Sequence, residues 1–127
     1  MSHQDPYATL SVSDDQRYLI CHVTRVPSLA EFRQMVTQIA QLGMRSNLPW
    51  VLFVVRSMPG HYGTMNAQDY GESIAKLLPG RFRVAILVND MNPHRKHLET
   101  VAINRRRHLK YFTEHDQALT WLFNSGA

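Results

Sequence analysis

This 127-residue sequence has a single cysteine and lacks any long hydrophobic run. The lone Cys21 excludes a disulfide within the chain, which fits a reducing compartment, and we expect a cytoplasmic protein. The longest apolar run, Trp50 to Val55, is about a third of the roughly 20 residues that cross a bilayer. No basic region followed by an apolar one opens the sequence, so we expect no signal peptide.

Motifs that carry catalysis or metal binding are also missing. The sequence has no glycine-rich phosphate loop, paired carboxylate motif or zinc-finger spacing. Cys21 and His22 look like a nucleophile and its base, but neighbours in a strand point to opposite faces and cannot meet. His94 and His97 would share a helix face, yet a metal needs further ligands, and we interpret them as exposed histidines. We therefore expect no catalytic residue, no metal and no cofactor.

Length and composition favour one domain spanning residues 1–127. Apolar residues make up 44% of the chain, which is ordinary for a soluble globule. A domain of this size buries roughly two thirds of its unfolded surface, so it can hold a core without crosslinks. We find no internal repeat, low-complexity tract or linker.

Positive charge is concentrated late in the chain. Residues 81–110 carry eight Lys/Arg and two Asp/Glu, a local charge of +6, whereas the rest sums to −2. Such a segment favours an anionic partner: a phosphate, an anionic membrane surface or an acidic protein. The alternative is a set of solvated cations at helix ends. Nucleic acid is not expected, because only one aromatic residue lies near the densest cluster. That cluster, the predicted anionic-partner patch, comprises Arg105, Arg106, Arg107 and Lys110.

Apolar periodicity predicts strands alternating with helices. Ser28 and Glu31 form a capping box that begins the first helix, and Gly43 is a plausible left-handed end. Asn66 can cap a second helix. Thr113 can cap a last helix, in which Asp116 is the third residue after the cap. The predicted strands span residues 9–13, 17–24, 50–55, 81–88 and 109–112. The predicted helices span 28–43, 66–78 and a segment from 94 or 97 to about 104, with a last helix after 113.

The order of these elements is β-β-α-β-α-β-α-β-α. Strands joined through helices need crossover connections, which are almost always right-handed. Residues 50–55 and 84–88 are apolar on both faces, as parallel strands inside a sheet are. We predict an α/β domain with a mixed, mostly parallel five-stranded sheet that begins with a hairpin.

This arrangement, over residues 18–123, resembles the SpoIIAA-like branch of the STAS fold, which is similar to the lipid-binding CRAL-TRIO domain. The segments that carry the resemblance are Arg81-Phe82-Arg83-Val84-Ala85, Glu99-Thr100-Val101-Ala102-Ile103-Asn104-Arg105, and Tyr111-Phe112-Thr113 with Ala118-Leu119-Thr120-Trp121-Leu122. The resemblance implies a regulatory or ligand-binding domain rather than an enzyme.

Two departures from that family limit what it implies. Better-known STAS members carry Asp-Ser-Ser/Ala-Gly after the third strand, with a phosphorylated serine, whereas residues 56–64 here read RSMPGHYGT. The phosphorylation switch is therefore not expected. Arg106 stands where the related branch tends to have a glycine that would serve a left-handed helix end.

Architecture also suggests where a ligand would bind. Successive crossovers of one hand crowd helices on one side of a sheet, so a helix, a subunit or a ligand must cover the other side. In open α/β sheets, ligands bind beyond the carboxyl ends of the strands. We predict a non-catalytic module that binds a small amphipathic or anionic ligand or a partner protein, including a second copy of the chain. The alternatives are a small enzyme working from the same crevice, and association with a membrane surface or nucleic acid through the basic residues 81–110. The predicted ligand-binding residues are Thr24, Arg25, Ser57, Met58, His61, Tyr62, Asn89 and Asp90.

Overall fold

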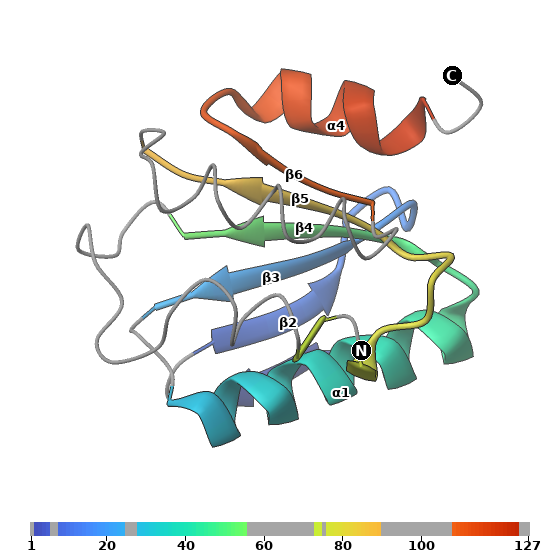
Figure 1. The fold of residues 1–127 in the computed structure, drawn as a ribbon. Helices are drawn as coiled ribbons and strands as arrows, with labels where there is room; N and C mark the ends of the chain where they lie inside the picture. The colour runs from blue at the N-terminus through green and yellow to red at the C-terminus, as the bar shows by residue number, and fades with distance from the viewer. Residues whose placement is uncertain are drawn as a thin grey trace.

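A computed structural model describes residues 2–5, 8–24, 28–55, 73–74, 76–89 and 108–124. These residues form a six-stranded sheet with a helix on each side (Figure 1). Residues 73–74 and 76–77 are also helical. The strands are β1 (Ser2–Asp5), β2 (Ala8–Val12), β3 (Leu19–Val23), β4 (Trp50–Val54), β5 (Arg83–Leu87) and β6 (His108–Phe112); the helices are α1 (Leu29–Ser46) and α4 (His115–Phe123).

The sheet has the order β1-β2-β3-β4-β5-β6. Strands β1, β2 and β3 pair antiparallel, whereas β3 to β6 pair parallel. The predicted mixed, mostly parallel sheet is confirmed. The parallel ladder extends past the ends of the strands, since the Val55 amide donates to the Leu87 carbonyl and the Val88 amide to the Phe112 carbonyl.

All five predicted strands are present, and a sixth, β1, was not predicted. Its sequence, Ser-His-Gln-Asp, contains none of the alternating apolar residues by which a strand is recognised. β1 lies at the edge of the sheet, in register with β2. A strand of this kind is specified by its partner rather than by its own side chains.

Helix α1 begins as its sequence predicts. The Glu31 amide donates to Ser28 Oγ at 3.1 Å, and the Ser28 amide donates to Glu31 Oε1 at 2.9 Å. These bonds satisfy two amides that the first turn leaves without partners. The apolar stripe of the helix is buried against one face of the sheet. The buried residues of α1 are Phe32, Met35, Val36, Ile39, Leu42 and Gly43.

The predicted helix end at Gly43 is wrong, because α1 continues to Ser46. Asn47 ends it with φ 57° and ψ 42°, the left-handed conformation that asparagine tolerates. Gly43 has a different reason to be a glycine. A Cβ placed there would lie 2.5 Å from the Phe82 ring and 2.9 Å from the Leu48 carbonyl oxygen. The residue lets the end of α1 approach the segment that leads into β5.

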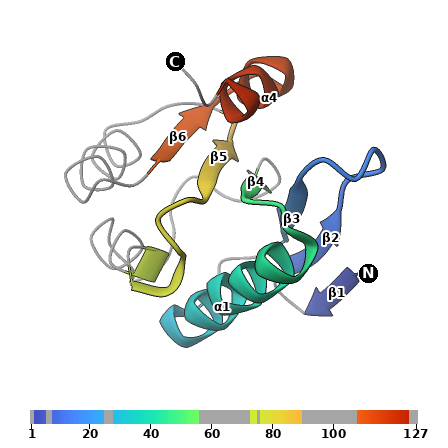
Figure 2. The ribbon, with the colours of Figure 1, turned by 90° about the vertical axis from the view of Figure 1, so that its right-hand side faces the viewer.

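Helix α4 packs on the face of the sheet opposite to α1 (Figures 1 and 2). Ala118 and Leu122 face the sheet, where they are buried in one cluster with Leu52, Ala85 and Leu87, and Trp121 packs partly buried against it. The prediction that Thr113 caps this helix is wrong: its N-cap is Glu114, without a side-chain cap bond. Of the three covers expected for the second face of the sheet, the structure shows a helix, because α4 covers β4 to β6 from that side.

Two predicted helices are described only in part or not at all. The helical residues 73–74 and 76–77 confirm the end of the second predicted helix, and Ile74 and Leu78 are buried in the α1 core. The third predicted helix, from 94 or 97 to about 104, lies outside the described residues. Among the helices that are described, none is long and apolar enough to cross a bilayer.

Candidate functional site

The predicted crevice at the carboxyl ends of the strands is described in part. Thr24 follows β3 and Asn89 follows β5; both are exposed and lie at the same edge of the sheet, because these strands are parallel. Arg25, Ser57, Met58, His61, Tyr62 and Asp90 lie outside the described residues. A ligand site at this edge stays a prediction.

The predicted anionic-partner patch is likewise described only at Lys110. This residue is exposed on β6, with its Nζ 5.6 Å from the centroid of the Phe112 ring. Arg105, Arg106 and Arg107 lie outside the described residues. The patch stays a prediction.

Cys21 and His22 are placed as the strand alternation predicts. Cys21 is buried in the α1 core, in register with Leu10 and Phe53 on the neighbouring strands. His22, the next residue along β3, is exposed. Within the described ranges, no group of three or more His, Cys, Asp or Glu side chains could hold a metal ion.

A groove of about 440 Å³ lies at the opposite edge of the sheet, between the turn joining β2 to β3 and the last turns of α4. We call it the turn–α4 groove. Its floor is apolar, whereas its rim is polar and exposed, with one carboxylate and one guanidinium. The groove is lined by Asp15, Arg17, Tyr18, Leu119, Thr120, Phe123 and Asn124.

The turn side of the groove is held by the hydroxyl of Ser13, which is buried. Ser13 Oγ donates to Asp15 Oδ1 at 2.6 Å and accepts from the amides of Arg17 and Tyr18 at 3.1 and 3.2 Å. The Ser13 amide donates to the Tyr18 carbonyl, and Gln16 completes the turn at φ 58°. These bonds fix the backbone from which Asp15 and Arg17 project.

The Phe123 ring of α4 joins the helix to this turn. Its centroid lies 4.2 Å from the Arg17 guanidinium carbon, 5.8 Å from the Tyr18 ring and 5.7 Å from the Trp50 ring. A guanidinium stacked on a ring keeps its N–H donors at the edge, where a planar anion can meet them. Arg17 is thus held in place by stacking before any ligand arrives.

The groove presents two opposite charges at neutral pH. The hydrogen bond from Ser13 lowers the pKa of Asp15, so this carboxyl is ionised. Burial raises the pKa of Tyr18, so its phenol is neutral. Together with Arg17, these groups offer a ligand a cation, an anion and a neutral hydroxyl.

Arg83, on β5, contacts the last turn of α4, which forms the helix side of the groove. Its Nη2 donates to the Trp121 carbonyl oxygen at 2.7 Å, and its guanidinium carbon lies 4.0 Å from the centroid of the Trp121 ring. The carbonyls of a last helical turn have no partner within the helix and attract cations. Burial lowers the pKa of Arg83, and its Nε has no hydrogen-bond partner among the described atoms. Arg83 therefore positions α4 rather than a ligand.

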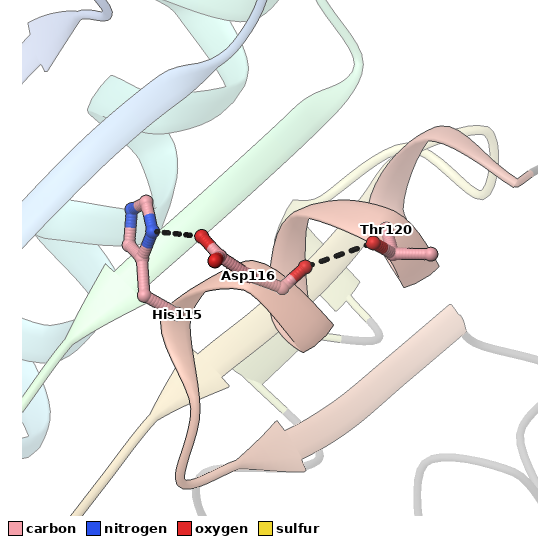
Figure 3. A network of polar contacts seen from close by, with 3 residues as sticks. All are labelled: His115, Asp116 and Thr120. Carbon is pink, nitrogen blue, oxygen red and sulfur yellow. Dashed lines mark hydrogen bonds and ion pairs between the residues drawn. The ribbon is translucent and has the colours of Figure 1, made fainter.

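Polar contacts link three residues at the start of α4 (Figure 3). His115 Nδ1 lies 3.4 Å from Asp116 Oδ1, and both side chains face solvent. Thr120 Oγ1 donates to the Asp116 carbonyl oxygen at 2.9 Å. Since that hydroxyl hydrogen is engaged, Thr120 can only accept a hydrogen bond from a molecule in the turn–α4 groove.

The chain matches a solved protein along nearly its whole length. That protein is an uncharacterised member of the DUF3478 family with a SpoIIAA-like fold, from Shewanella loihica PV-4. The two structures align with a TM-score of 0.57 and 18% sequence identity, over 91% of each chain. The chain has a SpoIIAA-like fold. No protein-family model and no curated protein matches the sequence.

The SpoIIAA-like fold confirms the resemblance drawn from the sequence, and at 18% identity it extends to the fold alone. The turn–α4 groove was not predicted. The sequence did indicate its two walls, the turn of the hairpin between the strands predicted at 9–13 and 17–24 and the last predicted helix. The sequence did not indicate which face of the sheet that helix covers, and without this the two walls could not be brought together.

Proposed function

We propose that this SpoIIAA-like domain is a non-catalytic binding or regulatory module whose turn–α4 groove takes an amphipathic ligand with an anionic group. The observation that carries the proposal is the guanidinium of Arg17, stacked on Phe123 at the rim of an apolar floor. A cation already held in place binds an anion at a lower entropic cost than a free side chain would. The proposal places the anion at Arg17 and the apolar body against Leu119 and Phe123.

Asp15 narrows the chemistry of that ligand. Its ionised carboxylate lies on the same rim as Arg17 and disfavours a molecule with several negative charges. A single carboxylate or sulfonate, alone or with an amine that faces Asp15, fits this pair of charges. A segment of a partner protein with the same groups would satisfy the groove equally.

Location, assembly and catalysis also belong to the proposal. Cys21 is the single cysteine of the sequence, so the chain cannot form an internal disulfide, which supports a reducing compartment such as the cytoplasm. The other partners that fit the sequence are a second copy of the chain, which would form a homodimer, and the surface of an anionic membrane. An enzyme acting at the carboxyl edge of the sheet would show turnover abolished by changes at Ser57 or His61. The proposed module has no turnover for such substitutions to abolish.

The test uses naphthalene-1-sulfonate, a planar apolar body with one anionic group. Titration followed by ¹⁵N chemical shifts should perturb the amides of residues 13–18 and 119–124. Thr120→Trp should fill the groove and Arg17→Gln should remove its cation, and each should weaken binding at least fivefold. Gln117→Trp is the matched control, because Gln117 is an exposed residue of α4 outside the groove; it should bind as the wild type does.

Native mass spectrometry of the purified protein complements the titration, since it reports a retained ligand and the oligomeric state together. Shifts centred elsewhere, or binding that Thr120→Trp leaves intact, would refute the groove as the site.

A further inference from the structure

Two large apolar side chains are exposed within the described ranges. Met44, in the last turn of α1, is 55% exposed, and Leu77, in the helical stretch 76–77, is 36% exposed. The Arg81 guanidinium donates to Met44 Sδ at 3.2 Å, which joins the segment after Leu77 to the end of α1. Exposed methionines are common at binding surfaces, because their flexible, polarisable side chains adapt to different partners.

Two cations lie at Met44, and a third lies next to Leu77 in the chain. Arg45 follows Met44, Lys76 precedes Leu77, and Arg81 contacts Met44; all three cations are exposed. Neither residues 32–55 nor residues 73–89 contain an acidic side chain. The surface therefore has a single sign of charge across both segments that form it, and it complements a negatively charged partner.

A hollow of about 640 Å³ adjoins this charge, lined by Ala40, Gln41, Met44 and Arg45. The hollow is shallow and open to solvent, so a side chain of a partner can lie against Met44. A lipid bilayer is bound by apolar side chains that protrude into it. Met44 is instead held at the surface by the hydrogen bond from Arg81 to its Sδ, and this favours a protein segment over a membrane.

Beyond the ligand of the turn–α4 groove, we propose that a second surface docks an acidic segment of a partner protein. The segment inserts one large apolar side chain beside Met44, and its carboxylates pair with the surrounding cations. We call this the α1-end surface; it comprises Ala40, Gln41, Met44, Arg45 and Arg81.

The experiment selects binders from a random 12-residue displayed peptide library on the full chain, and then measures Kd for synthetic copies by fluorescence polarisation. Enriched peptides should carry Asp or Glu around a single Leu, Phe or Trp. Arg45→Glu should weaken their binding at least tenfold and Met44→Ser at least threefold. Arg33→Glu is the matched control, an exposed arginine on the same helix outside the hollow, and should change Kd less than twofold.

Two results of the peptide experiment would overturn the proposal: no enrichment of acidic peptides, or equal Kd for the wild type and Arg45→Glu. A third experiment uses vesicles of three parts phosphatidylcholine to one part phosphatidylglycerol. If no peptide is selected and the chain binds these vesicles in a way that Arg45→Glu abolishes, the surface binds a membrane and the proposal is wrong. Circular dichroism confirms that each variant is folded. Thr120→Trp should leave peptide affinity unchanged, so this proposal and the groove can fail separately.

Discussion

Replacing Gly43 with alanine adds one methyl group where the end of α1 meets Phe82. The new Cβ would lie 2.5 Å from the ring and 2.9 Å from the Leu48 carbonyl oxygen, both shorter than a carbon contact of about 3.5 Å or more. Phe82 is only 2% exposed, so its ring has no open space into which it can turn. The substitution therefore requires a shift of the helix or of the segment before β5.

The magnitude follows from two opposing terms. Overpacking a buried site typically costs about 1–3 kcal/mol. Alanine in a helix interior gains about 1 kcal/mol over glycine. We expect Gly43→Ala to lower the free energy of unfolding by up to about 2 kcal/mol, although helix propensity alone predicts that it is stabilising.

A double-mutant cycle measured by urea unfolding tests this explanation. Phe82→Leu shortens the side chain that Gly43 accommodates, so Gly43→Ala should cost at least about 1 kcal/mol less in that background. If Gly43 instead acted as a left-handed helix end, the cost would be the same in both backgrounds. A stabilising Gly43→Ala in the wild type would refute the packing argument outright.

Three further changes test the cap of α1, the turn and the support of α4. Ser28→Ala removes the capping bond and should cost about 1 kcal/mol in urea unfolding; an unchanged midpoint would contradict the cap. The pKa of Asp15 is lowered by Ser13, so the carboxylate stabilises the fold above its unfolded pKa of about 3.9, and this contribution is lost as pH falls through the lower folded pKa. Asp15→Asn should therefore lower the free energy of unfolding at pH 7, and below about pH 4 the free energy of the variant should fall less steeply with pH than that of the wild type. The same pH dependence in both proteins would contradict this. Arg83→Ala removes the bond to the Trp121 carbonyl and should cost roughly 2 kcal/mol, with faster amide exchange in α4 than in α1; equal acceleration in both helices would argue against a local role.

The central strands could be predicted because their sequences allow few other structures. β4 and β5 are short and apolar on both faces, and the chain between them is long enough for a crossover. β1 could not be predicted, since Ser2 to Asp5 gain their strand conformation from pairing with β2. The end of α1 was misplaced because a glycine near a helix end serves either a left-handed turn or close packing. Only the approach of Phe82 decides between them.

The face on which α4 lies could not be derived from the handedness of crossovers. That rule governs a helix between two parallel strands of a sheet, and α4 follows the last strand, β6. The side chains of β5 are apolar towards both faces, so either side would bury the stripe of α4. The turn–α4 groove joins residues about a hundred positions apart, and it could not be found until that face was known. Of the residues predicted at the carboxyl edge, Thr24 and Asn89 lie there, and the others fall outside the described ranges.

Two adjacent residues link the faces on which the two proposed surfaces lie. Phe82 packs in the α1 core against Gly43, whereas Arg83 bonds to the Trp121 carbonyl in the last turn of α4. Successive residues of an extended chain point to opposite faces, so one short stretch of backbone supports both helix ends. A shift of this backbone that relieves contact at Gly43 also moves the guanidinium that anchors α4. The end of α1 and the wall of the turn–α4 groove thus depend on the same entry into β5, although the sheet separates them.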